Sequence, residues 1–184
     1  ALQFRRYDRA QIFAFDFGGS IRVAALAMGG DWHDLGGSLT DGGEGAVYLQ
    51  PLARIVDPGE RAWAAGWIAA ILAREGVTIT PEVKEHLWTA LSSLASAPIG
   101  ERTITGLAVL LQSTDLKQAL RPYCLGGPYG RLLDAEIEDL GEASVQAFEI
   151  EGLVGTGAAP AVLSYLFHRI GDRLDGRPTL LIID

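Results

Sequence analysis

The chain has 184 residues, of which 48% are hydrophobic, and it carries a formal net charge of −8. This length and apolar content are typical of one globular domain, or of one domain with an insertion, and no apolar stretch approaches the roughly 20 residues that a membrane-spanning helix requires. The acidic balance argues against a nucleic-acid-binding surface over this region of the protein.

The first expected element is a buried strand over residues 11–17, which contains an unbroken apolar run that stops at Asp16. Residues 18–20 are expected to form a turn, and residues 21–28 fit either a short helix or a strand. Residues 29–45 are so rich in glycine that we expect loops and a short hairpin there instead of a packed element.

A different pattern begins at Asp57, where an N-cap acceptor, a proline at the first helical position and a glutamate at the third follow one another. Four expected helices with short connections come next, and their apolar side chains recur at helical spacing. The pattern predicts a compact all-helical subdomain over residues 57–125, inserted between residues 1–56 and 126–184 of an α/β domain.

The chain returns to the α/β pattern after residue 126. We expect a strand at residues 145–150, a glycine loop, a helix over residues 159–174 and a last strand. A strand, a crossover helix and a second strand form a βαβ unit, which implies parallel pairing. Glu149 and Glu151 fall on the same side of their strand, and we expect that side to face solvent.

The last strand carries the first candidate for a functional residue. Four consecutive apolar residues, Leu180 to Ile183, leave no polar face, which predicts a strand buried on both faces. The run stops at Asp184. Because ligands of open α/β sheets bind at the carboxyl ends of parallel strands, Asp184 is a candidate to hold nucleotide-bound magnesium, directly or through water. An aspartate that opens a loop or caps the next helix is the alternative interpretation.

A second nucleotide interpretation rests on Gly155-Thr-Gly157-Ala-Ala-Pro160, which resembles the start of a dinucleotide-binding loop. Proline stands where that fingerprint requires glycine or alanine, and Asp184 lies farther on than its acidic residue usually does. No G-x-x-x-x-G-K-S/T phosphate-binding loop occurs in the sequence. The 3 histidines lack the spacing of zinc ligands, and the single cysteine, Cys124, is expected to be buried and unreactive.

Several short motifs follow one another along the chain. They are Gln11-Ile-Phe-Ala-Phe-Asp16, Gly18-Gly19-Ser20, Met28-Gly29-Gly30, Gln50-Pro51-Leu52-Ala53-Arg54-Ile55 and Thr179-Leu-Leu-Ile-Ile-Asp184. In this order, with the helical block before the last of them, they resemble the conjugal transfer ATPases of the TrbE/CagE type, which energise type IV secretion systems. The resemblance runs through nearly the whole chain, and the order of the motifs makes it more specific than any one of them.

The resemblance implies a partial RecA-like P-loop ATPase domain with parallel strands and an inserted all-helical subdomain. It implies that Asp184 is the Walker B aspartate, both catalytic and a ligand of Mg²⁺, with ATP as the other cofactor. It also implies that the phosphate-binding loop precedes Ala1 and that the acid that polarises the attacking water follows Asp184. We therefore expect the longer protein to be the ATPase and this chain alone to be inactive.

The resemblance further implies a motor that assembles as an oligomer with other type IV secretion components. Its expected location is the cytoplasm, at the inner face of the bacterial inner membrane and held there by partners, with no direct nucleic-acid binding by this segment. Two alternatives remain open. One is a non-catalytic assembly module of the secretion machine, and the other is the Rossmann-type dinucleotide-binding protein that the glycine loop suggests.

Overall fold

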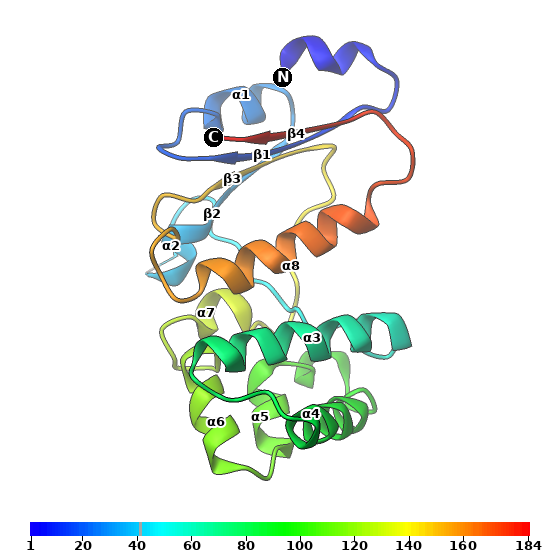
Figure 1. Cartoon of the computed structure of the whole chain (residues 1–184). Helices are drawn as coiled ribbons and strands as arrows, with labels where there is room; N and C mark the ends of the chain where they lie inside the picture. The colour runs from blue at the N-terminus through cyan, green and yellow to red at the C-terminus, as the bar shows by residue number, and fades with distance from the viewer. Residues whose placement is uncertain (41) are drawn as a thin grey trace. The chain divides into compact units, whose positions relative to one another are not determined.

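The structure is a computed structural model that describes residues 1–40 and 42–184. The chain divides into two compact units (Figure 1). Unit 1 contains residues 1–47 and 140–184, and unit 2 contains residues 48–139. All the helices expected between residues 57 and 125 belong to unit 2, so unit 1 is built from the two ends of the chain.

Unit 1 is organised around a sheet. Its strands are β1 (Gln11–Asp16), β2 (Asp31–Asp34), β3 (Val145–Glu149) and β4 (Thr179–Ile183). They lie in the order β2-β3-β1-β4, and every pairing between them is parallel. The helices of this unit are η1 (Leu2–Arg6), α1 (Arg22–Ala27), α2 (Leu35–Leu39) and α8 (Ala159–Asp172). The predicted α/β class with parallel strands is confirmed.

Alternate residues of β1 pack on opposite faces of the sheet, as the two-residue period of a strand requires. On one face, Ile12 joins an apolar cluster with Ala25 of α1. On the other face, Phe15 stacks on Phe148 of β3 and on Phe167 of α8, with both pairs of ring centroids 5.0 Å apart. Every residue of β1 is buried, which confirms the expectation for this strand.

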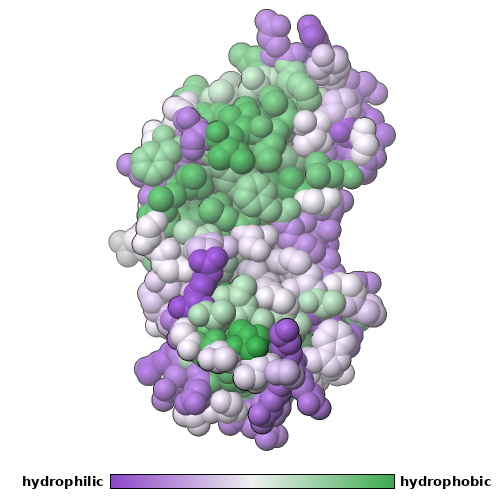
Figure 2. Space-filling view, viewed as in Figure 1, coloured by the Kyte–Doolittle hydropathy of each residue, from purple (hydrophilic) through white to green (hydrophobic). Residues whose placement is uncertain are grey.

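Strand β4 is less buried than its apolar sequence predicts. It lies at the edge of the sheet, and Leu181 and Ile183 are 43% and 65% exposed. Their neighbours across the pairing, Phe13 and Phe15, are buried, so burial on this face decreases within one strand. Figure 2 shows a broad hydrophobic area on the viewed face of unit 1. The prediction of burial on both faces was wrong, because no element among the described residues pairs with the outer edge of β4.

The described residues of the glycine-rich segment 29–45 contain β2 and α2, so the expected loops and hairpin were wrong; residue 41 lies outside the described residues. The glycines permit close packing. A Cβ atom on Gly30 would lie 2.4 Å from the carbonyl oxygen of Val145, and one on Gly45 would lie 2.4 Å from the Trp32 ring. Glycine is therefore required here by the neighbours of β2.

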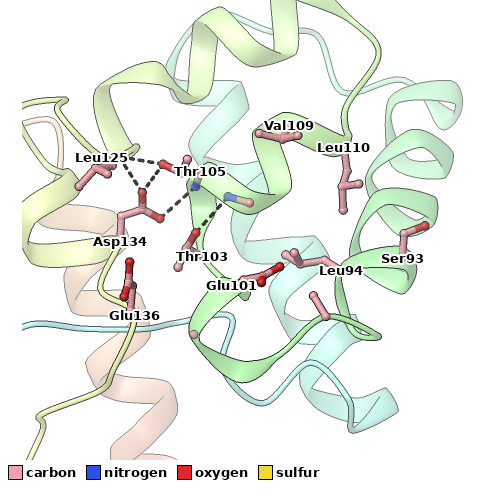
Figure 3. Close-up of a pocket in the computed structure, with 13 residues that line it drawn as sticks. Ser93, Leu94, Glu101, Thr103, Thr105, Val109, Leu110, Leu125, Asp134 and Glu136 are labelled. Carbon is pink, nitrogen blue, oxygen red and sulfur yellow. Dashed lines mark hydrogen bonds between the residues drawn. The ribbon is translucent and has the colours of Figure 1, made fainter.

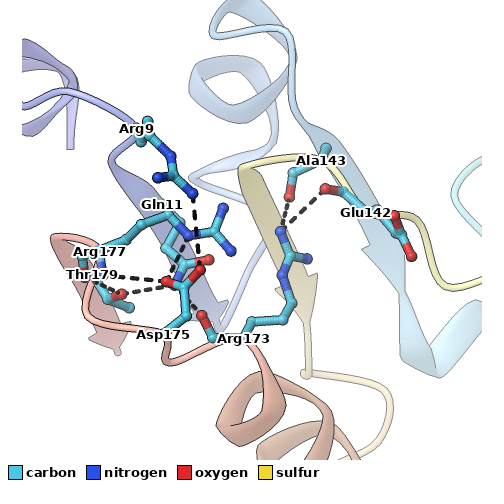
Figure 4. Close-up of polar contacts among 8 residues, drawn as sticks. All are labelled: Arg9, Gln11, Glu142, Ala143, Arg173, Asp175, Arg177 and Thr179. Carbon is cyan, nitrogen blue, oxygen red and sulfur yellow. Dashed lines mark hydrogen bonds and ion pairs between the residues drawn. The ribbon is translucent and has the colours of Figure 1, made fainter.

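A polar network joins the end of α8 to the amino-terminal edge of the sheet (Figure 4). The Arg173 guanidinium donates to the carbonyl oxygens of Glu142 and Ala143 at 3.1 and 2.8 Å. The side-chain amide of Gln11 donates to the carbonyl oxygen of Arg173 and to Thr179 Oγ1, both at 2.8 Å. These contacts connect α8 to β1, to β4 and to the segment before β3, and burial lowers the pKa of Arg173.

Unit 2 is helical. Its helices are α3 (Pro58–Arg74), α4 (Pro81–Leu94), η2 (Ile99–Glu101), α5 (Ile104–Leu110), α6 (Thr114–Leu120), η3 (Arg121–Tyr123) and α7 (Gly130–Leu133). The carboxylate of Asp57 accepts from the N–H groups of Gly59 and Glu60 at 2.8 and 3.0 Å, which confirms the predicted cap. Nowhere in the described residues is a helix both long enough and apolar enough to span a bilayer.

The two ends of unit 2 pair with each other. The N–H of Leu49 donates to the carbonyl oxygen of Leu132 at 2.8 Å, and the N–H of Ala135 donates to the carbonyl oxygen of Leu49 at 3.2 Å. The N–H of Asp139 also donates to the carbonyl oxygen of Tyr48 at 3.1 Å. All of these residues lie outside the range 57–125, so the ends contribute contacts that the helices alone do not make.

A fragment of residues 48–139 should fold alone, with a helical circular dichroism spectrum and a cooperative melt. A fragment of residues 57–125 lacks the paired ends, and a loss of about 1–2 kcal/mol from their hydrogen bonds lowers the melting temperature by roughly 5–10 °C in a domain of this size. Thermal melts of both fragments measure this. Equal midpoints would show that the ends do not stabilise unit 2, and a random-coil spectrum for both would contradict independent folding.

Candidate functional site

The carboxyl ends of the strands bring acidic residues into a row. Asp34, Glu149 and Asp16 are the last residues of β2, β3 and β1, and the register places Glu149 level with both of the others. Asp184 directly follows β4, and its N–H donates to the carbonyl oxygen of Phe15 at 3.0 Å. Because the strands are parallel, these acids line one edge of the sheet, where ligands of such folds bind.

Asp16 holds the turn that follows β1. Its carboxylate accepts hydrogen bonds from Ser20 Oγ at 2.7 Å and from the N–H of Ile21 at 2.9 Å. The turn contains Gly18 and Gly19 with φ angles of +98° and +71°, a left-handed conformation that other residues rarely adopt. Asp16 is 4% exposed, and both of its oxygens are used to hold this turn and the start of α1.

Glu149 is buried, so the expectation that it faces solvent was wrong. It is 7% exposed, and its Oε1 accepts from the N–H groups of Gly18 at 3.2 Å and Glu151 at 2.9 Å. Its Oε2 is buried without a hydrogen-bond partner among the described residues. The reason is topological: β3 lies between β2 and β1, and the turn after β1 folds over its end. Of the two glutamates expected at the surface, only Glu151 is exposed.

Asp34 was missed by the sequence analysis together with β2. Its carboxylate caps α2 by accepting from the N–H of Gly37 at 2.8 Å. A Cβ atom on Gly36 would lie 2.5 Å from the Cα of Gly152, so the segments that follow β2 and β3 are in direct backbone contact. The available signal was a short aromatic segment that ends in an acid between glycine pairs, a pattern too short to distinguish from a loop by periodicity.

Asp184, the site residue that the sequence predicted, lies at the expected edge of the sheet. It is exposed, and its side chain makes no hydrogen bond or ion pair with the residues that the structure describes. A carboxylate with free lone pairs suits a hard cation such as Mg²⁺, whereas the other acids of the row already accept hydrogen bonds from their own loops. Its roles as metal ligand and catalytic residue stay predictions.

The dinucleotide interpretation requires β3 and β4 to be neighbours joined by α8, as consecutive strands of that fold are. In the sheet, β1 lies between them. Helix α8 has Pro160 in its first turn, and its N-cap residue, Ala158, makes no side-chain cap. The glycine loop therefore departs from the dinucleotide fingerprint in topology as well as in sequence.

Two other side chains that the sequence analysis considered have structural environments. The thiol of Cys124 is partly buried, and burial raises its pKa to about 11, so it stays protonated at neutral pH, as expected of an unreactive cysteine. His33 is 7% exposed, and its ring stacks on Phe148 with centroids 5.3 Å apart, which is the environment of a core histidine.

Named proteins similar to this chain come from conjugation and secretion systems. The chain is 41% identical over its whole length to a probable conjugal transfer protein TrbE of Sinorhizobium fredii, and 43% identical over its whole length to the conjugal transfer protein TrbE of Rhizobium radiobacter. It is 25% identical over 64% of its length to the type IV secretion system protein VirB4 of Bartonella quintana. The chain spans 28% and 23% of the lengths of the two TrbE proteins. No protein-family model matches it.

The fold is similar to the solved structure of VirB4 of Thermoanaerobacter pseudethanolicus. The TM-score is 0.63, and the match covers 95% of this chain and 53% of that one. Because the two sequences are 15% identical, this likeness concerns the fold alone. Together with the parallel sheet, it confirms the predicted partial RecA-like α/β fold.

Glu149→Leu should lower the free energy of unfolding by about 2–4 kcal/mol, because it leaves the N–H groups of Gly18 and Glu151 without their acceptor. Glu151→Leu is the matched control: that side chain is exposed, and we expect a change within about 0.5 kcal/mol. Urea unfolding of both variants measures the difference. Equal effects would show that Glu149 does not hold the loop after β1.

Proposed function

Because the chain belongs to the family of TrbE conjugal transfer proteins and VirB4 type IV secretion proteins, we propose that it carries the magnesium-binding aspartate of an ATP-hydrolysing motor. In this proposal Asp184 is the Walker B residue. The longer protein uses ATP hydrolysis to energise conjugal DNA transfer or type IV secretion. The names of the relatives support the role in transfer and secretion, and hydrolysis is the step that the proposal adds.

The observation that carries the proposal is the position and freedom of Asp184. It follows a parallel strand at the carboxyl edge of the sheet, where nucleotides bind in open α/β folds. Among the acids of that edge it is the exposed one whose carboxylate the described residues leave unused, whereas Asp16 and Glu149 are buried against the turn after β1. This arrangement supports a metal ligand more than a capping residue.

The chemistry divides between Asp184 and the residues that shape the edge. When bound with ATP, Mg²⁺ bridges the phosphate oxygens and neutralises the charge that develops on the transferred group. Asp184 would hold that ion, directly or through water. Asp16 and Glu149 fix the Gly18–Gly19 turn, which keeps the edge in one shape and so lowers the reorganisation that binding requires. In the proposal, residues outside 1–184 supply the phosphate-binding loop, whose motif this sequence lacks.

The proposal includes assembly as an oligomer with other type IV secretion components. Its location is the cytoplasmic face of the bacterial inner membrane, where partner proteins hold it. The net charge of −8 supports attachment through proteins, because nucleic acids and anionic lipid surfaces repel an acidic surface.

A non-catalytic assembly module of the secretion machine is the second candidate. It is favoured by unit 2, where Val109 and Leu125 are 73% and 77% exposed, since clustered exposed apolar side chains mark protein contacts. The encoded residues before Ala1 separate the two functions. A G-K-S/T phosphate-binding loop there supports the motor, and its absence supports the module.

In the longer protein, Asp184→Asn should reduce magnesium-dependent ATP hydrolysis on the order of 100-fold or more, because the amide keeps the shape of the carboxylate without its charge. The melting temperature should not change, since the side chain is exposed. The control is Asp175→Asn at the amino-terminal edge, where the carboxylate contacts Arg177, and it should keep full activity. Steady-state phosphate release and thermal melts measure both. Unchanged turnover in Asp184→Asn would leave this residue as a loop or capping residue.

The 184-residue chain by itself should bind ATP weakly or not at all. The backbone N–H groups and lysine of a phosphate-binding loop supply most of the phosphate contacts in such enzymes, and this sequence contains no such loop. Titration calorimetry with ATP and Mg²⁺ checks this expectation. A dissociation constant in the micromolar range would contradict the assignment of the phosphate contacts to residues outside the chain.

A further inference from the structure

Unit 2 contains a hollow of about 470 Å³ beside α5, which we call the acidic hollow (Figure 3). Leu94, Val109 and Leu110 contribute apolar surface to its wall. Glu101 and Glu136 also line it, and both are exposed. In Figure 3 the two glutamates lie below Val109 and Leu110, so the apolar and the negatively charged regions of the wall are separate.

A buried carboxylate holds one wall of the acidic hollow in place. Asp134 is 6% exposed, and it accepts hydrogen bonds from the N–H of Thr105 at 3.0 Å, from the Thr105 hydroxyl and from the N–H of Leu125 at 2.7 Å. Burial raises the pKa of Asp134, and these hydrogen bonds oppose that rise. They join the start of α5 to the segment that carries Leu125, so this surface is formed before any partner binds.

A second hollow, of about 370 Å³, adjoins the first across the exposed face of α5, and we call it the basic hollow. Lys117 and Arg121 line it, and both are exposed. Thr105, Val109 and Leu125 line both hollows and form the ridge between them. Thr105 and Val109 are four residues apart on α5, which places them on the same side of that helix.

The charges of the two hollows are available to a partner. None of Glu101, Glu136, Lys117 and Arg121 forms an ion pair with another residue that the structure describes. The surface therefore presents an apolar ridge with unpaired negative charge on one side and unpaired positive charge on the other.

We infer that this face binds the same face of a second copy of the chain across a two-fold axis. A two-fold interface places one patch against itself, so the patch must be self-complementary. With the ridge of Val109 and Leu125 at the axis, the acidic hollow of each copy faces the basic hollow of the other. The inference concerns unit 2 alone and does not depend on the proposed function.

The apolar ridge supplies contact area to this interface, and the charges set its register. Specific interfaces bury about 1,200–2,000 Å² in total, and one ridge with two hollows lies at the low end of that range, so the dimer is weak, with a dissociation constant on the order of 10 μM. A basic apolar segment of another protein fits this face less well. It would match the acidic hollow but would meet Lys117 and Arg121 with like charge.

Two double variants of the 184-residue chain test the interface. Glu101→Lys with Glu136→Lys reverses the acidic hollow, and Lys117→Glu with Arg121→Glu reverses the basic hollow. Either reversal brings like charges together twice in the symmetric dimer, so each should raise the dissociation constant about tenfold or more. An equimolar mixture of the two variants should form a heterodimer about as tight as the parent dimer, because opposite charges then meet in both places. Sedimentation equilibrium over a range of concentrations measures all four samples.

The control is Glu85→Lys with Glu151→Lys, which changes the net charge as the first variant does but lies outside this face; its dissociation constant should equal that of the parent. Circular dichroism should show the parent fold for every variant, since all the substituted side chains are exposed. A parent chain that is monomeric at about ten times the expected dissociation constant would overturn the inference. So would an association that both reversals leave unchanged, or a mixture that does not regain affinity, because each would place the contact elsewhere.

Discussion

Parallel pairing is the constraint on which the rest of unit 1 depends. It turns the carboxyl ends of all the described strands to one edge, and the register of β3 with its two neighbours sets Glu149 beside Asp16 and Asp34. The segments that leave these strands must cross the same edge within a small space. This explains why Gly36 and Gly152 meet there backbone to backbone, at a distance that leaves no room for side chains.

The acids of this edge divide according to what they bind. Asp16, Asp34 and Glu149 accept hydrogen bonds from the loops and helices that follow their strands, and these donors offset some of their negative charge. Asp184 has no such contact among the described residues. A row of acids can therefore shape the edge and still leave one carboxylate for a cation, which is the division of roles that the proposed ATPase site requires.

Unit 2 uses a buried carboxylate in a similar way but forms a different kind of surface. Asp134 joins α5 to the segment around Leu125, as Asp16 joins β1 to α1. In unit 1 the rigid region lies at the end of a sheet and leads to a cation site. In unit 2 it lies under an exposed apolar ridge flanked by opposite charges, which is a surface suited to another protein chain.

Local patterns in the sequence determined the helices of unit 2, the strands β1 and β3, and the position of Asp184 after a strand. Caps such as Asp57 on α3 join residues two or three positions apart, so spacing alone specifies them. Tertiary structure decided the rest. The apolar run of β4 indicates a strand, but only the strand order makes it an edge strand. Gly30 belongs to a packed segment because Val145, far along the chain, lies against it, and Glu149 is buried because β3 is flanked on both sides. Contacts between residues distant in sequence leave no local period, so the sequence alone did not reveal them.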